Sequence, residues 1–345
     1  MFQNLPNTSN VSGVAHCPLL TGYRLLCSAF CLLATAFWFL VTAQGQTPTP
    51  AEILRIDSDL VNLNVSVFNR AASNSAANLQ PKDFFILDNG EPQEISFFGS
   101  TATPFDLVLL LDLSGSTADK LGLIRKSSKR FVDAARPGDR IAIFTFAAEI
   151  RGVCKFTNDH EVLKRSIDEI EKPIGGTNFW DALRFVIEHV VNQSRAEHRR
   201  SAIVVMTDGV DNALPGVYGE GSRATTFEEL VESQRRSETI VLPIYLDTER
   251  ESNSRGTPPG AYSMARDQLA ALAEESGNPL YRARKLQDLD GVYGQVIRDL
   301  GTVYSIGYRP TNRGRDGLWH NVTVRMVGHS DLALRAKRGY YENKQ

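Results

Sequence analysis

Short apolar segments alternate with amphipathic helical segments between residue 105 and about residue 302. Such alternation is typical of a parallel sheet whose two faces are covered by helices. We expect strands at residues 106–111, 140–146, 153–156, 201–207, 239–246 and 279–282, with 153–156 as an antiparallel edge. We expect helices at residues 120–135, 159–170, 179–193, 227–237, 265–276 and 289–303. The predicted fold class is α/β, with a doubly wound, mostly parallel six-stranded sheet of the Rossmann-like kind.

Period-two alternation predicts strands on both sides of this region. Val61, Leu63, Val65 and Val67 alternate with polar residues, as in a strand with one wet face. Residues 84–87 and 95–98 flank an Asp-Asn-Gly turn and predict a hairpin. Residues 304–308, 320–327 and 332–337 predict three further strands. Because neither β segment has enough strands to bury a core alone, we expect them to pair into one small β-sandwich beside the α/β domain.

The chain begins with a segment that resembles a secretory leader. An apolar run from Leu25 to Val41 follows Arg24 and ends in small residues, as a signal peptide does. The run is at the short limit for a membrane helix, so an uncleaved N-terminal anchor is the alternative. We expect an exported protein, either periplasmic, on the cell surface or secreted, and possible membrane attachment is limited to this segment.

The predicted domain organisation follows from these patterns. The parts are a signal peptide or anchor at residues 1–43, a linker at 44–58, an N-terminal β segment at 59–103, the α/β domain at 104–303 and a C-terminal β segment at 304–341. Cleavage after Ala43 leaves Cys154 as the single cysteine, which cannot form an internal disulfide and is predicted to be a small buried hydrophobic residue. The formal net charge of −2 gives no electrostatic argument for a nucleic-acid partner, and none is expected.

Three polar motifs border the predicted parallel strands. Asp112, Ser114 and Ser116 alternate along the loop after residue 111, Thr177 lies in Gly-Gly-Thr-Asn, and Asp208 lies in Thr-Asp-Gly. Open α/β sheets place ligands outside the carboxyl ends of their strands, so we expect these five side chains to meet. All five offer hard oxygen atoms, which suit Mg²⁺, Mn²⁺ or Ca²⁺, with Mg²⁺ as the expected ion. Only two carry charge, so a bound cation would stay electrophilic and accept an outside carboxylate.

These motifs, in this order, resemble the metal-ion-dependent adhesion site of von Willebrand factor type A domains. The resemblance extends over roughly residues 55–341 and includes the flanks of a secreted subfamily best known from Acidobacteria. Its flanking motifs are Asp-Phe-x-x-x-Asp-Asn-Gly at residues 83–90, Tyr-Ser-Ile-Gly-Tyr at 304–308 and Arg-Gly-Tyr at 338–340. The resemblance implies a protein-binding, adhesion-type module that captures a Glu or Asp of a partner protein through a divalent cation.

Several residues near the motifs have two interpretations. Asp211 is a candidate outer-shell carboxylate, since metal ligands are often supported by such groups. Asn178 and Asp181 are also candidates for the outer shell or the rim of the cation site. Alternatively, Asp181 suits the positive end of the helix that follows residue 178, and Asn178 caps the same helix. Trp180 is either a partner-contacting aromatic or a core residue. The polar loop at residues 247–263 is a surface excursion or a partner-contacting rim.

Enzyme signatures are weak in this sequence. The histidines show no His-Glu-x-x-His spacing, and Ser114 lacks the Gly-x-Ser-x-Gly elbow of serine hydrolases. No general base is marked near the acidic motifs, so we expect binding and no catalysis. Two alternatives remain open: a structural subunit of a cell-envelope assembly with a purely stabilising metal, and a metal-assisted hydrolase.

Overall fold

The computed structural model describes most of the chain after residue 59. The described ranges are 60–69, 78–115, 120–171, 175–191, 199–217, 224–249, 257–258, 260–311, 314 and 317–342. They belong to one compact unit, Asp59–Gln345. The predicted leader, the linker, Ser116, and residues 250–256 and 259 of the polar loop at 247–263 lie outside these ranges. No helix within them combines the length and the hydropathy that a bilayer crossing needs.

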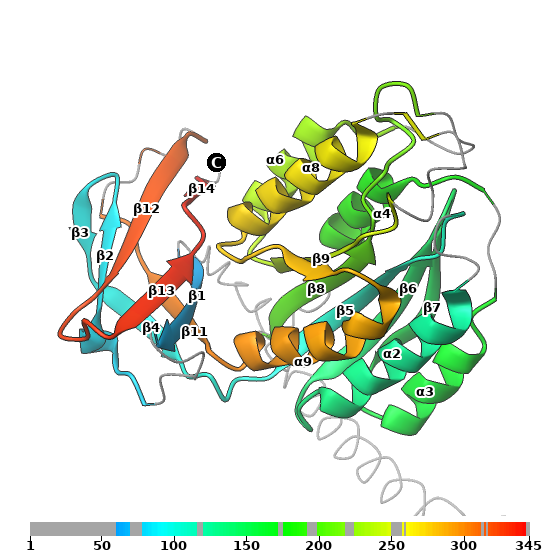
Figure 1. Ribbon diagram of the computed structural model, residues 1–345. Coiled ribbons are helices and arrows are strands. Elements are labelled where there is room, and N and C mark those ends of the chain that lie inside the picture. Colours follow the sequence, from blue (N-terminus) through cyan, green and yellow to red (C-terminus); the bar gives the residue numbers. More distant parts are fainter. Residues whose placement is uncertain are drawn as a thin grey trace, which may run out of the picture. The chain divides into compact units, whose positions relative to one another are not determined.

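A six-stranded sheet forms the centre of the α/β domain, in the order β10-β9-β8-β5-β6-β7 (Figure 1). Its strands are β5 (Phe105–Asp112), β6 (Arg140–Phe146), β7 (Ile150–Thr157), β8 (Arg200–Thr207), β9 (Ile240–Leu246) and β10 (Tyr281–Ala283). All neighbours are parallel except β6 and β7. Every residue of β5, β8 and β9 is buried, because helices cover both faces of the sheet. The predicted fold class is confirmed.

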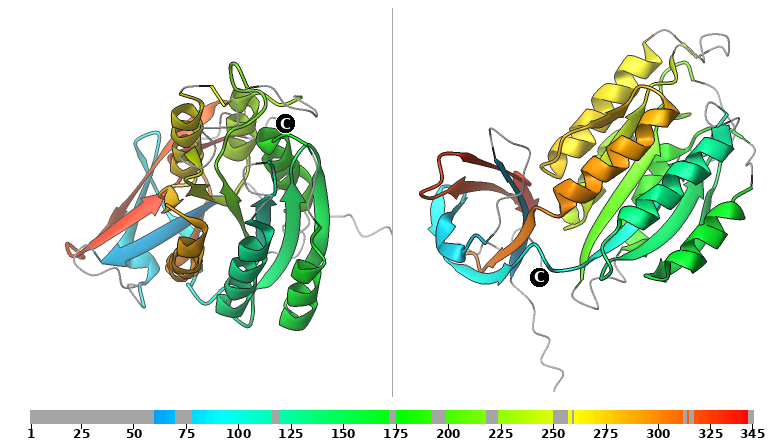
Figure 2. Two further views of the ribbon diagram at one scale, coloured as in Figure 1. Left: turned by 45° about the vertical axis from the view of Figure 1, so that its right-hand side comes forward. Right: turned by 60° about the horizontal axis from the view of Figure 1, so that its bottom comes forward.

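Helices cover the two faces of this sheet in two sets (Figure 2). One set is α2 (Leu121–Ala134), α3 (His160–Asp168) and α9 (Leu289–Leu300), and the other is α4 (Phe179–Phe185), α6 (Phe227–Arg236) and α8 (Ala261–Glu275). The described residues also contain three short helical turns: η1 (Pro81–Asp83), the π-helical η3 (Val186–Val190) directly after α4, and η4 (Leu286–Asp288). Asp159 caps α3 by accepting from the amides of Glu161 and Val162, and Thr226 with Glu229 forms a capping box on α6. Local sequence therefore sets where these helices begin.

The β segments before and after the α/β domain join into a two-sheet sandwich, as expected. One sheet has the order β13-β1-β11-β4 and the other β14-β12-β2-β3. Their strands are β1 (Val61–Asn69), β2 (Phe84–Asp88), β3 (Glu91–Gln93), β4 (Ile95–Gly99), β11 (Val303–Tyr308), β12 (Trp319–Met326), β13 (Leu332–Ala336) and β14 (Gly339–Tyr341). Val65, Ile86 and Ile306 are fully buried between the sheets. Each half therefore supplies strands that the other half needs to enclose a core.

The predicted hairpin is wrong in its second strand. Asn89 and Gly90 form the expected turn, with φ of 50° and 89°. The strand that returns from this turn is β3, which pairs with β2, whereas β4 pairs with β11 in the opposite sheet. A short stretch of alternating apolar and polar residues looks the same in either sheet. The sequence therefore did not show that the chain passes from one sheet to the other between β3 and β4.

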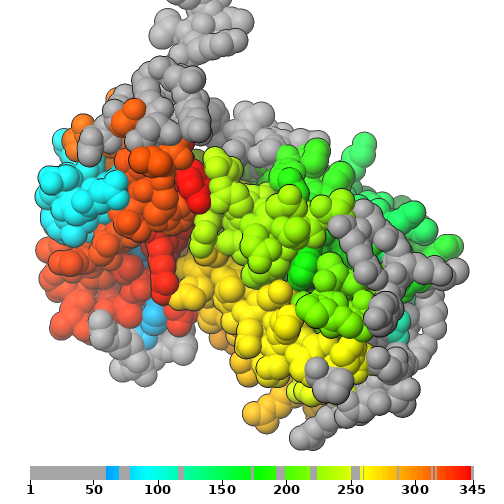
Figure 3. Space-filling model, turned by 90° about the horizontal axis from the view of Figure 1, so that it is seen from above, coloured from blue at the N-terminus to red at the C-terminus, as the bar shows by residue number. Residues whose placement is uncertain are grey.

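Lys337 fixes the end of the sandwich to helix α6. Its Nζ donates to the backbone carbonyls of Gln234, Arg235 and Ser237, with distances of 3.4 Å to Gln234 and 2.8 Å to Ser237. A cation suits this position because the last carbonyls of a helix carry partial negative charge. The neighbouring strand β14 also contacts α6, and Figure 3 shows the red C-terminal segment beside the yellow-green helix.

Candidate metal centre

The carboxyl ends of β5 and β8 bring two acidic loops together. The strands are parallel neighbours, and Leu111 is paired with Met206. The next residues, Asp112 and Thr207, therefore leave the sheet side by side, and Asp208 follows at once. Strand β9 is the next neighbour of β8 and ends just before Thr248. Residues far apart in the sequence thus meet at one edge, where open α/β sheets bind ligands.

Asp112 is held by neutral donors on both carboxylate oxygens. Oδ1 accepts from the amide of Ser114 at 2.8 Å, and Oδ2 accepts from the hydroxyl of Thr207 at 2.6 Å. The amide of Leu113 donates to the carbonyl of Phe146 at 2.9 Å, which fixes the start of the loop against β6. Asp112 is fully buried and Ser114 nearly so. The loop is therefore shaped before any ligand arrives.

Asp208 is held in the same manner from the other side. Its Oδ1 accepts from the amide of Val210 at 3.2 Å, and its Oδ2 accepts from the hydroxyl of Thr248 at 2.7 Å. Asp208 and Thr248 are both buried. The sequence interpretation missed Thr207 and Thr248 as supporting residues. Their position directly at the end of a buried parallel strand was the available signal.

Thr177 is tied to the loop that carries Asp208. Its amide donates to Oδ1 of Asn212 at 3.0 Å, and its carbonyl accepts from the amide of Asn212 at 2.8 Å. Gly176 leaves room for this arrangement, because a Cβ at that position would lie 2.7 Å from Oδ1 of Asn212. Asn212 thus connects the Thr177 loop to the Asp208 loop, a role that the sequence interpretation also missed.

The structure places four of the five residues expected to bind the cation. Asp112, Ser114, Thr177 and Asp208 lie on loops that hydrogen bonds join into one cluster. Ser116 lies outside the described residues.

The two carboxylates repel each other in a buried setting. Burial, and then repulsion from Asp208, raise the pKa of Asp112 to about 7. The donors named above are neutral hydroxyls and amides, so they orient the acids without neutralising them. A hard dication suits such a pair. Among the described residues no group of three or more His, Cys, Asp or Glu side chains gathers to hold a metal. The residues present fit a cation bound by two acids and several hydroxyls.

Asp211, and not Asn178, supplies the side-chain acceptor at the start of α4. Asn178 occupies the N-cap position of α4, but its side chain makes no cap hydrogen bond, so the capping hypothesis is wrong. Its side chain donates to the carbonyl of Ala148 at 2.7 Å and accepts from Asn212. Asp211 supplies the missing acceptor, because its Oδ2 accepts from the amide of Trp180 at 3.0 Å. Burial raises the pKa of Asp211.

Asp181 and Trp180 stabilise the same region. Asp181 lies in the first turn of α4, where an acid interacts favourably with the helix dipole. Its Oδ1 also accepts from the amide of Thr225 at 2.8 Å, which anchors the segment before α6. Trp180 is 7% exposed and its ring lies 5.8 Å from that of Phe227, which agrees with core packing.

Cys154 is partly buried and packs against the core on one face of the sheet.

Comparisons with known proteins give limited similarity at the level of whole chains. No curated protein sequence matches the chain. It is similar to proximal thread matrix protein 1 from the mussel byssus with a zinc-occupied MIDAS motif, at 16% identity over 63% of this chain and 50% of that chain, with a TM-score of 0.45. It is also similar to BatB from Bacteroides thetaiotaomicron, at 15% identity over 56% of this chain and 98% of that chain, with a TM-score of 0.41. The chain spans about half the length of the mussel protein.

A family model gives a stronger result. The von Willebrand factor type A domain model matches residues 106–289, which is more than half of the 345 residues. The matched range contains Asp112, Thr177 and Asp208 together with the strands that position them. The chain therefore belongs to the von Willebrand factor type A domain family.

Proposed function

We propose that this protein is an exported, cation-dependent protein-binding module. Asp112, Ser114, Ser116, Thr177 and Asp208 would form a complete metal-ion-dependent adhesion site. The observation that supports this most strongly is the pair of buried carboxylates, Asp112 and Asp208, held by neutral donors at the ligand-binding edge of the sheet. Mg²⁺ is the cation we favour, with Mn²⁺ and Ca²⁺ as alternatives.

Each residue has a defined part in this proposal. Asp112 and Asp208 hold the ion directly or through water, and the hydroxyls of Ser114, Ser116 and Thr177 complete its protein ligands. Thr207 and Thr248 keep the two carboxylates oriented. When bound, the cation supplies a site for a carboxylate oxygen from a Glu or Asp of a partner protein. Because the loops are already hydrogen bonded, little ordering entropy opposes that capture.

The proposal is one of binding and not of turnover. Both oxygens of Asp112 and both oxygens of Asp208 already accept hydrogen bonds within the protein. Each of these oxygens keeps a further lone pair for the cation, and the proposal assigns no residue as the general base that a hydrolase would need. A metal-assisted hydrolase would need turnover that disappears in Asp208→Asn.

Export and the subfamily are parts of the same proposal. Residues 1–43 have the composition of a signal peptide or an N-terminal anchor, which would place the module in the periplasm, on the cell surface or outside the cell. The flanking motifs resemble those of secreted type A proteins best known from Acidobacteria. In the structure, Asp88, Tyr308 and Tyr340 from these three motifs meet in one hydrogen-bonded cluster.

A capture experiment with a chelator tests this function. The immobilised chain is incubated with cell-envelope extract in Mg²⁺ and, separately, in EDTA. We expect partner proteins to be retained only with Mg²⁺ and to be lost from Asp208→Asn. Asp168→Asn is a suitable control, because Asp168 is an exposed acid that pairs with Lys129 away from the site. Equal retention in Mg²⁺ and EDTA would overturn the proposal.

A stabilising metal is the second candidate function. The same hydrogen bonds that position the acids also join loops from β5, β8 and β9, so a cation there would stiffen the edge of the sheet. Ser114→Ala separates the two functions. Loss of partner binding with an unchanged melting temperature supports capture, whereas a lower melting temperature with partner binding retained supports the structural role.

A further inference from the structure

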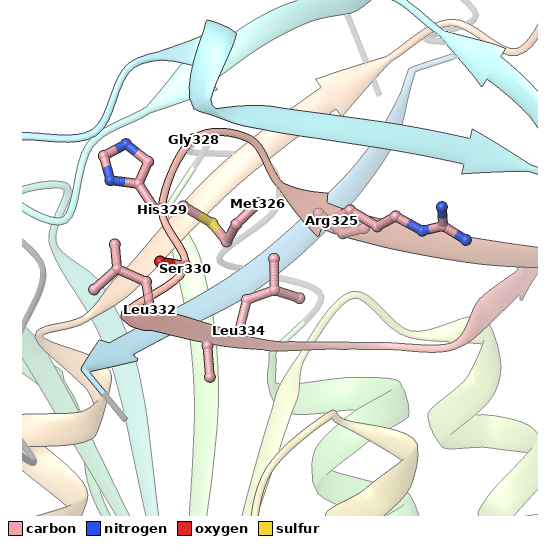
Figure 4. Close-up of a pocket in the computed structure, with 9 residues that line it drawn as sticks. Arg325, Met326, Gly328, His329, Ser330, Leu332 and Leu334 are labelled. Carbon is pink, nitrogen blue, oxygen red and sulfur yellow. The ribbon is translucent and has the colours of Figure 1, made fainter. Parts of the chain in front are cut away.

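The β-sandwich has an open seam between β12 and β13. β13 is the edge strand of its sheet and pairs with β1 on one side. β12 pairs with β2 over residues 322–326 but with β14 only over residues 319–321. Within the described ranges no strand pairs with the outer edge of β13 or with the second half of β12 on that side. A hollow of about 740 Å³ lies between the two strands (Figure 4).

Backbone groups of β12 face this seam. The amide of Val322 donates to the carbonyl of Arg338, on the side away from β2. In an antiparallel strand the backbone groups of alternate residues point to the same side. The amides and carbonyls of Val324 and Met326 therefore face the seam, beyond the point where β14 ends. Such an edge is a template for one more strand.

The floor of the seam is apolar. Val324 and Met326 of β12 and Leu334 of β13 pack against the sandwich core, yet each is only partly buried. Leu332 lines the same hollow, and Figure 4 shows Met326, Leu332 and Leu334 around it. These side chains point inward, where the next strand of a closed sandwich would cover them. The seam therefore offers apolar contacts for every second side chain of an added strand.

Both ends of the seam are closed. At one end, Gly328 turns the chain from β12 towards β13 with a φ of 76°. At the other end Ala336 lies against Gly277, where a Cβ would overlap the backbone of Ala336. An occupant between these ends has about five residues, or roughly 17 Å of extended chain.

The rim of the seam is basic. Arg325 from β12 and Arg335 from β13 are exposed, and within the described residues neither forms an ion pair with a carboxylate. The Arg335 guanidinium lies 4.4 Å from the Phe68 ring centroid, which fixes it on the outer face of the sheet. On an added strand, side chains that alternate with the apolar ones would lie beside these arginines. Opposite charges on neighbouring strands attract each other.

We propose that this seam binds a short, acidic, extended segment of a partner protein by β-strand addition. Its backbone would pair with Val324 and Met326, its apolar side chains would cover Leu334, and its acidic side chains would meet Arg325 and Arg335. This site is separate from the metal centre and needs no cation.

A labelled peptide of seven alternating glutamate and valine residues tests the proposal with the full chain. Fluorescence anisotropy should show binding at low salt that EDTA does not change. A lysine–valine peptide of the same length should bind about tenfold more weakly. A glutamate–valine peptide with N-methylated valines should not bind, because the valine amides that would face β12 can no longer donate. Equal binding of all three peptides, or of none, would overturn the proposal.

Charge reversal gives a matched set of variants. Arg325→Glu and Arg335→Glu should each weaken binding of the glutamate–valine peptide several-fold and strengthen binding of the lysine–valine peptide. Lys126→Glu makes the same charge change on an exposed face of α2 and should alter the affinity for neither peptide. Arg325→Glu remains informative if loss of the Phe68 contact destabilises Arg335→Glu. Self-association of the chain that Leu334→Lys abolishes, without peptide binding, would instead identify a second copy as the occupant and overturn the proposal.

Discussion

The hydroxyl of Thr207 donates to Oδ2 of Asp112 at 2.6 Å, and both residues are fully buried. The same hydroxyl accepts from the amide of Gly209 at 2.9 Å, so its proton is directed at the carboxylate. Thr207 belongs to the Asp208 motif in sequence but supports the Asp112 motif in space. The two acids are therefore positioned as one unit.

Removing the Thr207 hydroxyl should weaken cation binding. Thr207→Val keeps the shape of the side chain but leaves Oδ2 of Asp112 without this donor. Loss of such a supporting group lowers metal affinity by about 10- to 100-fold. Isothermal titration with Mn²⁺ and Mg²⁺ measures the change.

A control for this variant lies at the opposite end of the same sheet. Thr239 and Ser201 share a buried hydroxyl–hydroxyl hydrogen bond of 2.8 Å at the start of β9 and β8. Thr239→Val should lower stability by about 1 kcal/mol and leave cation affinity unchanged. Similar affinity losses in both variants would mean that Thr207 acts only through general stability.

The cation-free protein should become less stable as the pH rises from about 4 to about 7. Burial and repulsion from Asp208 raise the pKa of Asp112 to about 7 in the folded state, while an unfolded Asp titrates near 3.9. Between these values the folded state binds more protons than the unfolded state, so the free energy of unfolding falls with rising pH. Thermal melts in EDTA at several pH values measure this slope.

Two further experiments test whether Asp112 causes this dependence of the free energy of unfolding on pH. Saturating Mg²⁺ should remove much of it, because a cation favours the charged form of Asp112. Asp112→Asn should also remove it, since the amide does not titrate. A slope that persists unchanged in Asp112→Asn would assign it to other groups.

A methyl group at Gly176 should disturb the Thr177 loop. In Gly176→Ala the new Cβ would lie 2.7 Å from Oδ1 of Asn212, which must then move away from the amide of Thr177. Overpacking of this kind costs about 1 to 3 kcal/mol. We expect a lower free energy of unfolding in urea together with weaker cation binding.

Gly122 provides the comparison for Gly176. It lies in α2 with open space around the position of a Cβ, so Gly122→Ala should stabilise the helix by up to about 1 kcal/mol. Gly176→Ala with wild-type stability and wild-type cation affinity would contradict the role given to Asn212.

Asp88 should support the sandwich without affecting the metal centre. Its carboxylate accepts from the hydroxyls of Tyr308 at 2.8 Å and Tyr340 at 2.9 Å, and Nδ1 of His320 lies 2.8 Å from it. Asp88→Asn removes the charge and replaces one acceptor oxygen with a donor, so it breaks at least one of these contacts in a buried site and should cost about 3 kcal/mol, against about 1 kcal/mol for Tyr340→Phe. Urea denaturation measures both. Equal losses for the two variants, or a change in cation affinity, would contradict this separation.

Local patterns identified most of the elements, because burial and alternation set them. β6 has the bounds that its apolar pattern indicated, and the buried runs of β5 and β8 differ from expectation by a residue at their ends. The doubly wound architecture of the sheet followed from the alternation of strands and helices. The sheet that β4 joins could not be predicted, because the side-chain pattern of a short strand is the same in either sheet.

The acids and hydroxyls of the candidate site could be predicted from the sequence, but the residues that hold them in position could not. Asp112 and Asp208 could be found because each follows a buried strand. Thr248 and Asn212 were missed, because their hydrogen bonds to Asp208 and Thr177 depend on how three loops approach one another. Asn178 was assigned as a cap because its residue type favours that role, whereas Asp211 from another loop supplies the acceptor.

A direct titration of the folded chain with Mn²⁺, followed by electron paramagnetic resonance, tests the central claim most sharply. Wild-type protein and Asp168→Asn should both bind the ion at a single site that Mg²⁺ competes for, and Asp208→Asn should lose that site while keeping its fold by circular dichroism. Indistinguishable Mn²⁺ binding by wild type and folded Asp208→Asn would contradict a cation held between Asp112 and Asp208.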